Sequence, residues 1–178
     1  YLTHESFLTK KDVLKHCAGG RVDGVLISVS KETEDTTHFD ALKNAHIPFV
    51  FFDRDLEGYD APKVLTNDVE SGQVATEHLI EMGCKHPVFL SPSDSLSVCN
   101  RRYEGFKLAE NKAKHPNHQL RYHVIDCHQP GASITGQIKN ILLQDKAIDG
   151  ILASVEDLAI HSYLACLALN LLIPTHIK

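Results

Sequence analysis

The sequence predicts an α/β fold in which parallel sheets are flanked by helices. Two observations carry this prediction. Short apolar runs alternate with stretches of helical periodicity over most of the 178 residues, and the connectors between them are short. Strands that alternate with helices form parallel sheets through right-handed crossovers. With 43% hydrophobic residues, a chain of this length can build one large domain or two small lobes.

The first third of the chain supplies helices and strands in turn. Leu8, Val13, Leu14 and Cys17 approximate one helical face, and Gly19-Gly20 can supply the left-handed residue that ends a helix. The apolar runs within 23–30 and 49–52 predict strands that are buried on both faces. We also expect a helix that carries Phe39, Leu42 and Ala45, begins at a Thr36 or Thr37 cap and ends before Pro48. A short strand is expected near residues 63–66.

The rest of the chain continues the alternation. Asn67-Asp68 opens a helix that ends at Gly83. The same Asn67-Asp68 pair is the candidate boundary between a lobe of residues 1–67 and a lobe of residues 68–178. One face of that helix carries Val74, Ala75, His78, Leu79 and Met82. Later elements are expected as strands at 87–90, 122–126 and 148–153 and helices at 100–111, 132–144 and 155–171, with a polar loop over 112–119.

Polar residues follow the predicted strands, in contrast to the apolar strands themselves. In open parallel sheets, ligands bind beyond the carboxyl ends of the strands. The sequence therefore predicts a ligand site built from these strand ends. They are Ser28–Ser30, Asp53–Arg54, Ser91–Ser93, Asp126–His128 and Ser154–Glu156.

The composition indicates which cell compartment and which kinds of binding partner to expect. The five cysteines are odd in number and form no CxxC pair, which is typical of a reducing cytosol rather than of a secreted disulfide framework. A formal net charge of −5 gives the chain no global electrostatic footprint for nucleic acid. No apolar run is long enough to cross a membrane, and no secretory signal is visible at the start.

Five stretches resemble motifs of the LacI/GalR family of transcription regulators. Each is weak alone, but five in the family's order and at compatible spacings make a strong signal. They are Arg21–Ser28, which resembles the family's (R)VDG strand; Ile47–Arg54, similar to IPxVxxDR; Asn67–Gly83, similar to NDxxxGxxAxxHLIxxG; Arg102–Phe106, similar to RxxGF; and Asp149–Ala153, which resembles the strand that enters the AxND motif.

The resemblance implies a two-lobed, periplasmic-binding-protein-like effector domain with flavodoxin-like sheets. Residues 1–67 would form part of its N-terminal lobe and 68–178 part of its C-terminal lobe. Measured against the family, the chain is expected to be cut at both ends: it lacks the helix-turn-helix that binds operator DNA, and it stops at Ile173–Lys178. The family further implies a cytoplasmic homodimer and a small polar effector, a sugar or sugar derivative, which binds between the lobes and changes operator affinity allosterically.

The resemblance also suggests effector-binding residues. It places Asp53 at an effector contact, where a carboxylate can accept hydrogen bonds from sugar hydroxyls; the alternative is a helix cap or an ion pair with Arg54. Arg102 corresponds to the arginine of RxxGF, which reaches the effector in the family; the alternative is a surface salt bridge with Glu104 or Asp94. The neighbouring Arg101 is expected to be solvated.

Two further positions depart from the family pattern. His128 stands where the family often has an aromatic residue that stacks on the ligand, and an imidazole can stack and hydrogen-bond; the alternative is an exposed loop histidine. Val155-Glu156 replaces the family's Asn-Asp. Because Val155 cannot hydrogen-bond an effector, this replacement predicts an altered choice of ligand or a degraded site.

Other classes of function are less well supported. No GxSxG, HExxH, P-loop or GxGxxG motif occurs, so we expect neither an enzyme nor a cofactor. A periplasmic sugar-binding protein of a transport system is the alternative with the same fold. Zinc is not expected either, because the nearby candidate ligands lack a metal-site spacing on one fixed element. Those candidates are His115, His118, His123, Cys127 and His128.

Overall fold

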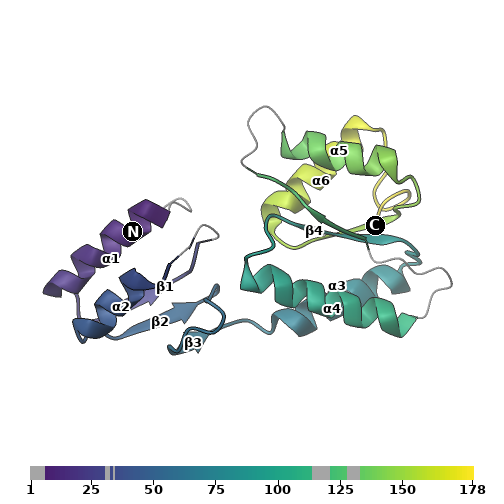
Figure 1. The fold of residues 1–178 in the computed structure, drawn as a ribbon. Helices are drawn as coiled ribbons and strands as arrows, with labels where there is room; N and C mark the ends of the chain where they lie inside the picture. The colour runs from purple at the N-terminus through teal and green to yellow at the C-terminus, as the bar shows by residue number, and fades with distance from the viewer. Residues whose placement is uncertain (1–6, 31–32, 34, 114–120, 128–132) are drawn as a thin grey trace. The chain divides into compact units, whose positions relative to one another are not determined.

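The chain folds as two compact units, each of which contains a parallel sheet flanked by helices (Figure 1). The computed structural model describes residues 7–30, 33, 35–113, 121–127 and 133–178. The first unit comprises Tyr1–Thr66 and Ser95–Val98, and the second comprises Asn67–Asp94 and Cys99–Lys178. The predicted α/β fold class is confirmed. Within the described ranges no helix has both the length and the apolar character needed to cross a membrane.

The first unit is built on a three-stranded parallel sheet in the order β1-β2-β3. The first helix ends in a π-helical turn, η1, in which Gly20 takes a left-handed conformation with φ of 77°, as expected for Gly19-Gly20. The elements are α1 (Phe7–His16), η1 (Cys17–Arg21), β1 (Val25–Ile27), α2 (Thr37–Asn44), β2 (Phe49–Phe52) and β3 (Lys63–Val64).

Helices α1 and α2 cover one face of this sheet. Phe39 of α2 is fully buried and packs edge-on against Phe51 of β2, with ring centroids 5.2 Å apart. Leu14 of α1 and Ile27 of β1 belong to the same cluster. This packing fixes the register, because Val25, Ile27, Phe49 and Phe51 turn one way while the alternate residues turn the other way.

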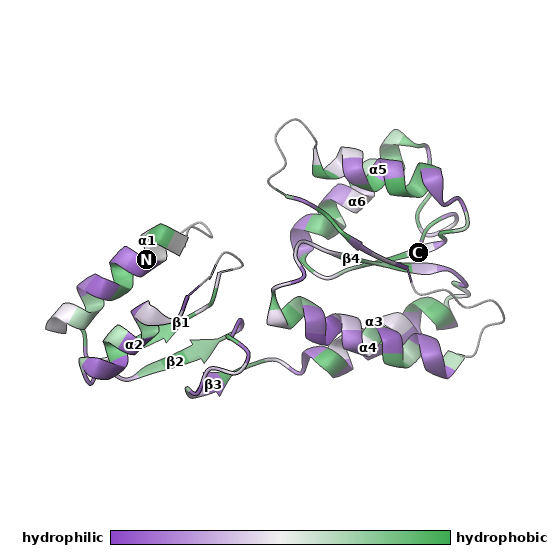
Figure 2. Cartoon of the chain, in the orientation of Figure 1, coloured by the Kyte–Doolittle hydropathy of each residue, from purple (hydrophilic) through white to green (hydrophobic). Residues whose placement is uncertain are grey.

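The expectation that these strands are buried on both faces is wrong for the structure as described. On the second face, Leu26 is 73% exposed, Phe52 43% and Val64 67%. Strand β2 is coloured as strongly apolar in Figure 2. The run of apolar residues correctly indicated a parallel strand, but among the described residues the helices of this unit contribute to the core on one side only.

The second unit holds a parallel sheet in the order β5-β4-β6, with the fully buried β4 at its centre. Figure 1 shows α3 and α4 on one side of β4 and α5 and α6 on the other. The elements are α3 (Asp68–Glu81), β4 (Pro87–Ser91), α4 (Ser97–Ala113), β5 (Arg121–Val124), α5 (Ile134–Gln144), β6 (Gly150–Ala153) and α6 (Glu156–Ala168). The first residues of α4, Ser97 and Val98, are grouped with the first unit.

Helix α3 packs through a different face from the apolar one that the sequence suggested. Val74 is 56% exposed and Met82 51% exposed, whereas Gly72 and Thr76 are buried. A Cβ atom at Gly72 would lie 2.1 Å from the carbonyl oxygen of Arg102 in α4. Close backbone approach between α3 and α4 therefore selects the small residues as the contact face. Of the predicted apolar face, Val74 and Met82 are exposed, whereas Leu79 packs against the core.

Candidate functional site

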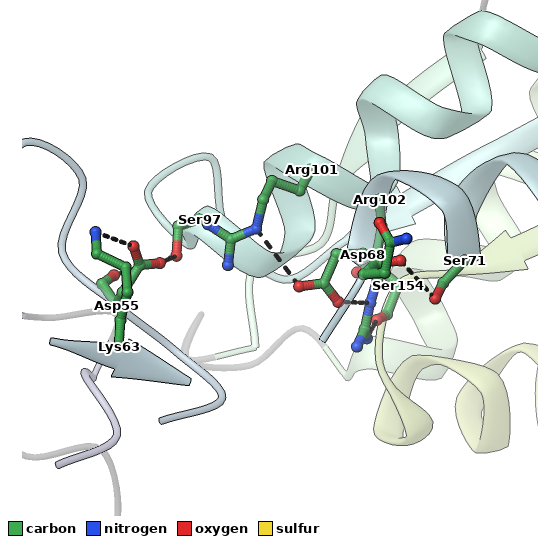
Figure 3. Close-up of polar contacts among 9 residues, drawn as sticks. Asp55, Lys63, Asp68, Ser71, Ser97, Arg101, Arg102 and Ser154 are labelled. Carbon is green, nitrogen blue, oxygen red and sulfur yellow. Dashed lines mark hydrogen bonds and ion pairs between the residues drawn. The ribbon is translucent and has the colours of Figure 1, made fainter. Parts of the chain in front are cut away.

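The candidate site of the second unit centres on Arg102, in the second turn of α4 (Figure 3). Its Nε donates to Asp68 Oδ1 at 3.0 Å, and its Nη1 donates to the carbonyl oxygen of Ser154 at 2.7 Å. The next residue, Tyr103, packs against Tyr122 of the sheet with ring centroids 4.4 Å apart. The guanidinium is thus held by α3 and by the end of β6, on a helix that is packed on the sheet.

Asp68 is the buried counter-ion of this site. It is the first residue of α3, where the positive end of the helix dipole stabilises a carboxylate, and its side chain is 0% exposed. Its second oxygen accepts from Arg101 Nε at 3.4 Å. The expectation that Arg101 is a solvated neighbour is therefore wrong: its side chain is 26% exposed and shares Asp68 with Arg102. A buried carboxylate is normally paired with nearby cations, because an unpaired buried charge destabilises the folded state by about 3 kcal/mol or more.

Arg102 keeps hydrogen-bonding capacity after these contacts. Its ion-pair partner is Asp68, not Glu104 or Asp94 as the salt-bridge alternative proposed. Nε and Nη1 are engaged, but Nη2 has no hydrogen-bond partner among the described residues, and the side chain is 30% exposed. Guanidinium nitrogens only donate, so the free edge of Arg102 suits a hydroxyl, carbonyl or carboxylate oxygen.

Ser154 adds an unsatisfied hydroxyl beside Arg102. The residue follows β6, is 2% exposed, and its backbone N–H donates to the carbonyl oxygen of Leu90 at 2.9 Å. Its Oγ is enclosed and has no hydrogen-bond partner within the described part of the chain. Buried hydroxyls are normally paired, so an orphaned one often marks a functional position.

Val155 and Glu156 follow directly, at the start of α6. Val155 adopts an extended conformation, makes no side-chain cap, and packs against the core cluster shared by α5 and α6. Glu156 is the first residue of α6 and is exposed. Ser154, whose carbonyl oxygen accepts from Arg102, directly precedes Val155 and Glu156, and Val155 is only partly buried against the core.

The remaining predicted residues are Asp53 and His128. Asp53 belongs to the first unit, follows β2, is exposed, and takes an uncommon left-handed backbone with φ of 62°. Its backbone N–H donates to the carbonyl oxygen of Val64 at 3.1 Å. His128 lies outside the described residues. Several zinc candidates do as well, and among the residues that are described no group of three or more His, Cys, Asp or Glu side chains could hold a metal ion.

The sequence did not reveal three members of these polar clusters. Asp68 stood in the Asn-Asp motif and was interpreted as the start of a helix and as a lobe boundary, not as the counter-ion of Arg102. Ser154 stood at a predicted strand end, but nothing in the sequence singled out its hydroxyl. Asp55 was not singled out in the sequence, yet its side chain is 3% exposed and contacts Lys63 and Ser97 (Figure 3).

Comparison with known proteins matches this architecture. A family profile described as periplasmic binding proteins and sugar binding domain of LacI family matches residues 5–177. The chain is 35% identical over 105 residues to the HTH-type transcriptional repressor PurR of Vibrio atlanticus, covering 59% of this chain and 31% of that protein. It is 29% identical over 158 residues to the repressor of the same name from Actinobacillus pleuropneumoniae serotype 5b, covering 89% of this chain and 46% of that protein.

A solved structure shares the fold. It is a LacI family transcriptional regulator from Enterococcus faecium with bound ribose, which matches with a TM-score of 0.76 at 24% identity over 93% of this chain and 60% of that one. The chain spans less than half the length of the two repressors. Because the family profile matches nearly every residue, the chain belongs to the family of periplasmic binding proteins and LacI-type sugar-binding domains.

Proposed function

We propose that this chain is the ligand-sensing part of a LacI-type transcription regulator, and that it binds a small polar effector of the sugar class. The observation that carries the proposal is the Arg102 guanidinium, which Asp68 and Ser154 hold in place while Nη2 stays free to donate. A donor fixed in advance loses little conformational freedom on binding. In this proposal Asp53, Arg102, Val155 and Glu156 contact the effector, and His128 is a further candidate.

The relatives favour a regulator over a transport protein. The two repressors named above are HTH-type transcriptional repressors, and one structural neighbour holds ribose. None of the five cysteines forms a disulfide bond in the described structure, which suits a reducing cytoplasm. We further propose that the site binds without turnover, that the chain is not an enzyme, and that residues 1–67 and 68–178 are parts of the N-terminal and C-terminal lobes of the effector domain.

The proposed mechanism is linkage between effector and operator DNA. The effector changes the protein only through its different affinities for two conformations. A helix-turn-helix elsewhere in the full-length protein would contact DNA, and a homodimer would place two such heads on half-sites about one helical turn apart. Operator affinity is then sensitive to small changes in the spacing of the heads.

A thermal-shift screen of the full-length protein tests the proposal. The panel contains sugars, including ribose, together with sugar acids, nucleobases and amino acids. A compound at about 100 times its Kd adds roughly 2.7 kcal/mol of stability. Arg102→Ala should abolish the shift. The matched control is Arg121→Ala, which also removes a half-buried arginine paired with an aspartate, Asp145 at 2.6 Å, and it should keep the shift.

The outcomes separate the site from the function. A shift lost in Arg102→Ala and kept in Arg121→Ala supports both. A shift that survives Arg102→Ala leaves a sensor but places its site elsewhere. No shift with any compound, together with operator binding that none of them alters, argues against a sensor of the sugar class.

A further inference from the structure

Helix α6 carries an exposed apolar stripe along its outer side. Four large apolar side chains of this helix are about half exposed: Ile160 is 53% exposed, Tyr163 54%, Leu164 43% and Leu167 54%. Their spacing of i, i+3, i+4 and i+7 places all four on one face of the helix. We call these four residues the α6 stripe.

The α6 stripe faces away from the core of the second unit. The buried residues of the helix are Leu158, Ser162, Ala165 and Cys166, and three of them belong to the core cluster shared with β4 and α5. With 3.6 residues per turn, this buried face and the α6 stripe lie on opposite sides of the helix. The packing of α6 on its own unit therefore leaves the stripe exposed.

Charge is missing from this part of the sequence. Residues 158–175 contain no Asp, Glu, Lys or Arg, although these residues make up 23% of the sequence. The other helices of the second unit expose fewer large apolar residues: Val74 and Met82 on α3, Leu108 on α4 and Leu143 on α5. A surface helix usually carries charged side chains on its outer face, and a contiguous apolar patch there marks an interaction surface.

We propose that the α6 stripe is the centre of a two-fold contact between two copies of this chain. The homodimer is part of the proposed function, on which this inference rests, and the inference names its surface. Most homo-oligomers are two-fold dimers, in which one patch meets the same patch of the partner. An uncharged stripe can meet itself without like-charge repulsion, which a charged helix face could not.

The symmetry also fixes the order of the contacts. A two-fold axis that crosses the stripe at right angles sets the two copies of α6 antiparallel. Ile160 of one protomer then lies opposite the partner's Leu167, and the other way round. Tyr163 and Leu164 occupy the middle of the stripe, so they lie next to the axis.

The area of the α6 stripe fits the centre of such an interface. Four large side chains, each about half exposed, present on the order of 400 Å² of surface. A stable dimer buries about 800 Å² on each protomer. The stripe would provide about half of this area as an apolar centre, and polar residues around it would provide the rim.

The oligomeric state of the full-length protein, without effector or DNA, tests the proposal. Sedimentation velocity over a range of concentrations measures the Kd of the dimer. Leu164→Glu sets two like charges against each other next to the axis and should raise this Kd about 100-fold. Leu108→Glu is the matched control, because Leu108 is 47% exposed on α4, on the other side of β4 from α6 (Figure 1). It should leave the Kd unchanged.

Two double variants test the antiparallel arrangement. Ile160→Lys with Leu167→Glu places opposite charges across the contact, whereas Ile160→Glu with Leu167→Glu places like charges there. The first variant should dimerise at least about tenfold more tightly than the second. The two positions are about 10 Å apart along one helix, so their charges do not pair within a protomer.

Three results would overturn the proposal. The first is a wild-type protein that is monomeric. The second is a dimer whose Kd does not respond to Leu164→Glu; a lowered urea midpoint in that variant would then mean that another part of the full-length chain covers the stripe. The third is equal dimerisation of the two double variants. Because no effector is present, the result is independent of the screen for effectors, and either proposal can fail alone.

Discussion

At the scale of single residues, the buried hydroxyl of Ser154 lowers the stability of the fold at a position beside the candidate effector site. Its hydroxyl is buried without a partner in the described part of the structure, and such a group costs about 1–3 kcal/mol of stability. We predict that Ser154→Ala raises the free energy of unfolding by about 1 kcal/mol, as measured by urea denaturation. The backbone carbonyl that binds Arg102 remains.

Ser162 provides the control for that measurement. It is also a buried serine of the second unit, but its Oγ donates to the carbonyl oxygen of Leu158 at 2.7 Å. Ser162→Ala should therefore lower stability or leave it unchanged. If both substitutions destabilise the protein equally, the Ser154 hydroxyl has a partner after all.

Glu110 is a second residue whose surroundings predict a measurable effect. Burial in α4 raises the pKa of this carboxyl to about 7, with Asp149 adding to the rise and Arg121 opposing it. Since the folded pKa lies above the unfolded value of about 4.3, the folded state keeps its proton longer. Stability contributed by this group is full at low pH, falls as pH rises towards 7, and stays lost above it.

Glu110→Gln removes this titration. We predict that the variant and the wild type differ least near pH 5, and that the variant gains on the order of 2 kcal/mol by pH 8. Urea midpoints measured at several pH values between 5 and 8 provide the test. A difference that does not depend on pH would show that Glu110 ionises as freely in the folded state as in the unfolded chain.

At the scale of elements, the contact between α3 and α4 is set by glycines. A Cβ at Gly72 would meet the Arg102 carbonyl oxygen at 2.1 Å, and one at Gly105 would meet the Val69 carbonyl oxygen at 2.0 Å. Backbone atoms cannot rotate away, so the helices must separate. We predict that Gly72→Ala destabilises the second unit by about 3 kcal/mol, measured by urea denaturation.

Gly19 is the reference substitution for that prediction. A Cβ there would have no neighbour within 4 Å, so Gly19→Ala should change the urea midpoint little. A normal midpoint for Gly72→Ala would mean that α3 can move away from α4 at little cost, and the Arg102–Asp68 contact should then be examined for the same displacement.

The same contact explains which features of the elements could be predicted. Alternation of apolar runs and helical periods located the strands and helices, because those periods follow from backbone geometry alone. The packing face of α3 could not be found in this way, because Gly72 contributes nothing to a hydrophobic pattern and its role appears only when α4 is beside it. Likewise, Leu26 is equally apolar whether or not another layer covers β1.

At the scale of the whole molecule, the candidate site combines residues that are distant in sequence. Arg102 could be singled out because RxxGF is a local motif. Its partners could not, because Asp68 and Ser154 lie 34 and 52 positions away from it, and no local pattern connects them. Asp53, Arg102, Val155 and Glu156 stay predictions as effector contacts, and only a binding measurement can establish them.

The two units also have separate cores, and this predicts stepwise unfolding of the 178-residue chain. The cluster around Phe39 and Phe51 contains only residues of the first unit, whereas the clusters around Leu90 and Phe89 contain only residues of the second. The first unit is smaller and leaves one apolar sheet face exposed. A small domain buries a lower fraction of its surface on folding, so we expect the first unit to unfold at lower urea.

Pulse-labelled hydrogen exchange across a urea series would resolve the two steps, with segment 39–51 reporting on the first unit and segment 87–91 on the second. Phe51→Leu should lower only the first midpoint, because Phe51 is buried in that cluster alone, and Gly72→Ala should lower only the second. Coincident midpoints that shift together in both variants would mean that the units unfold as one cooperative body.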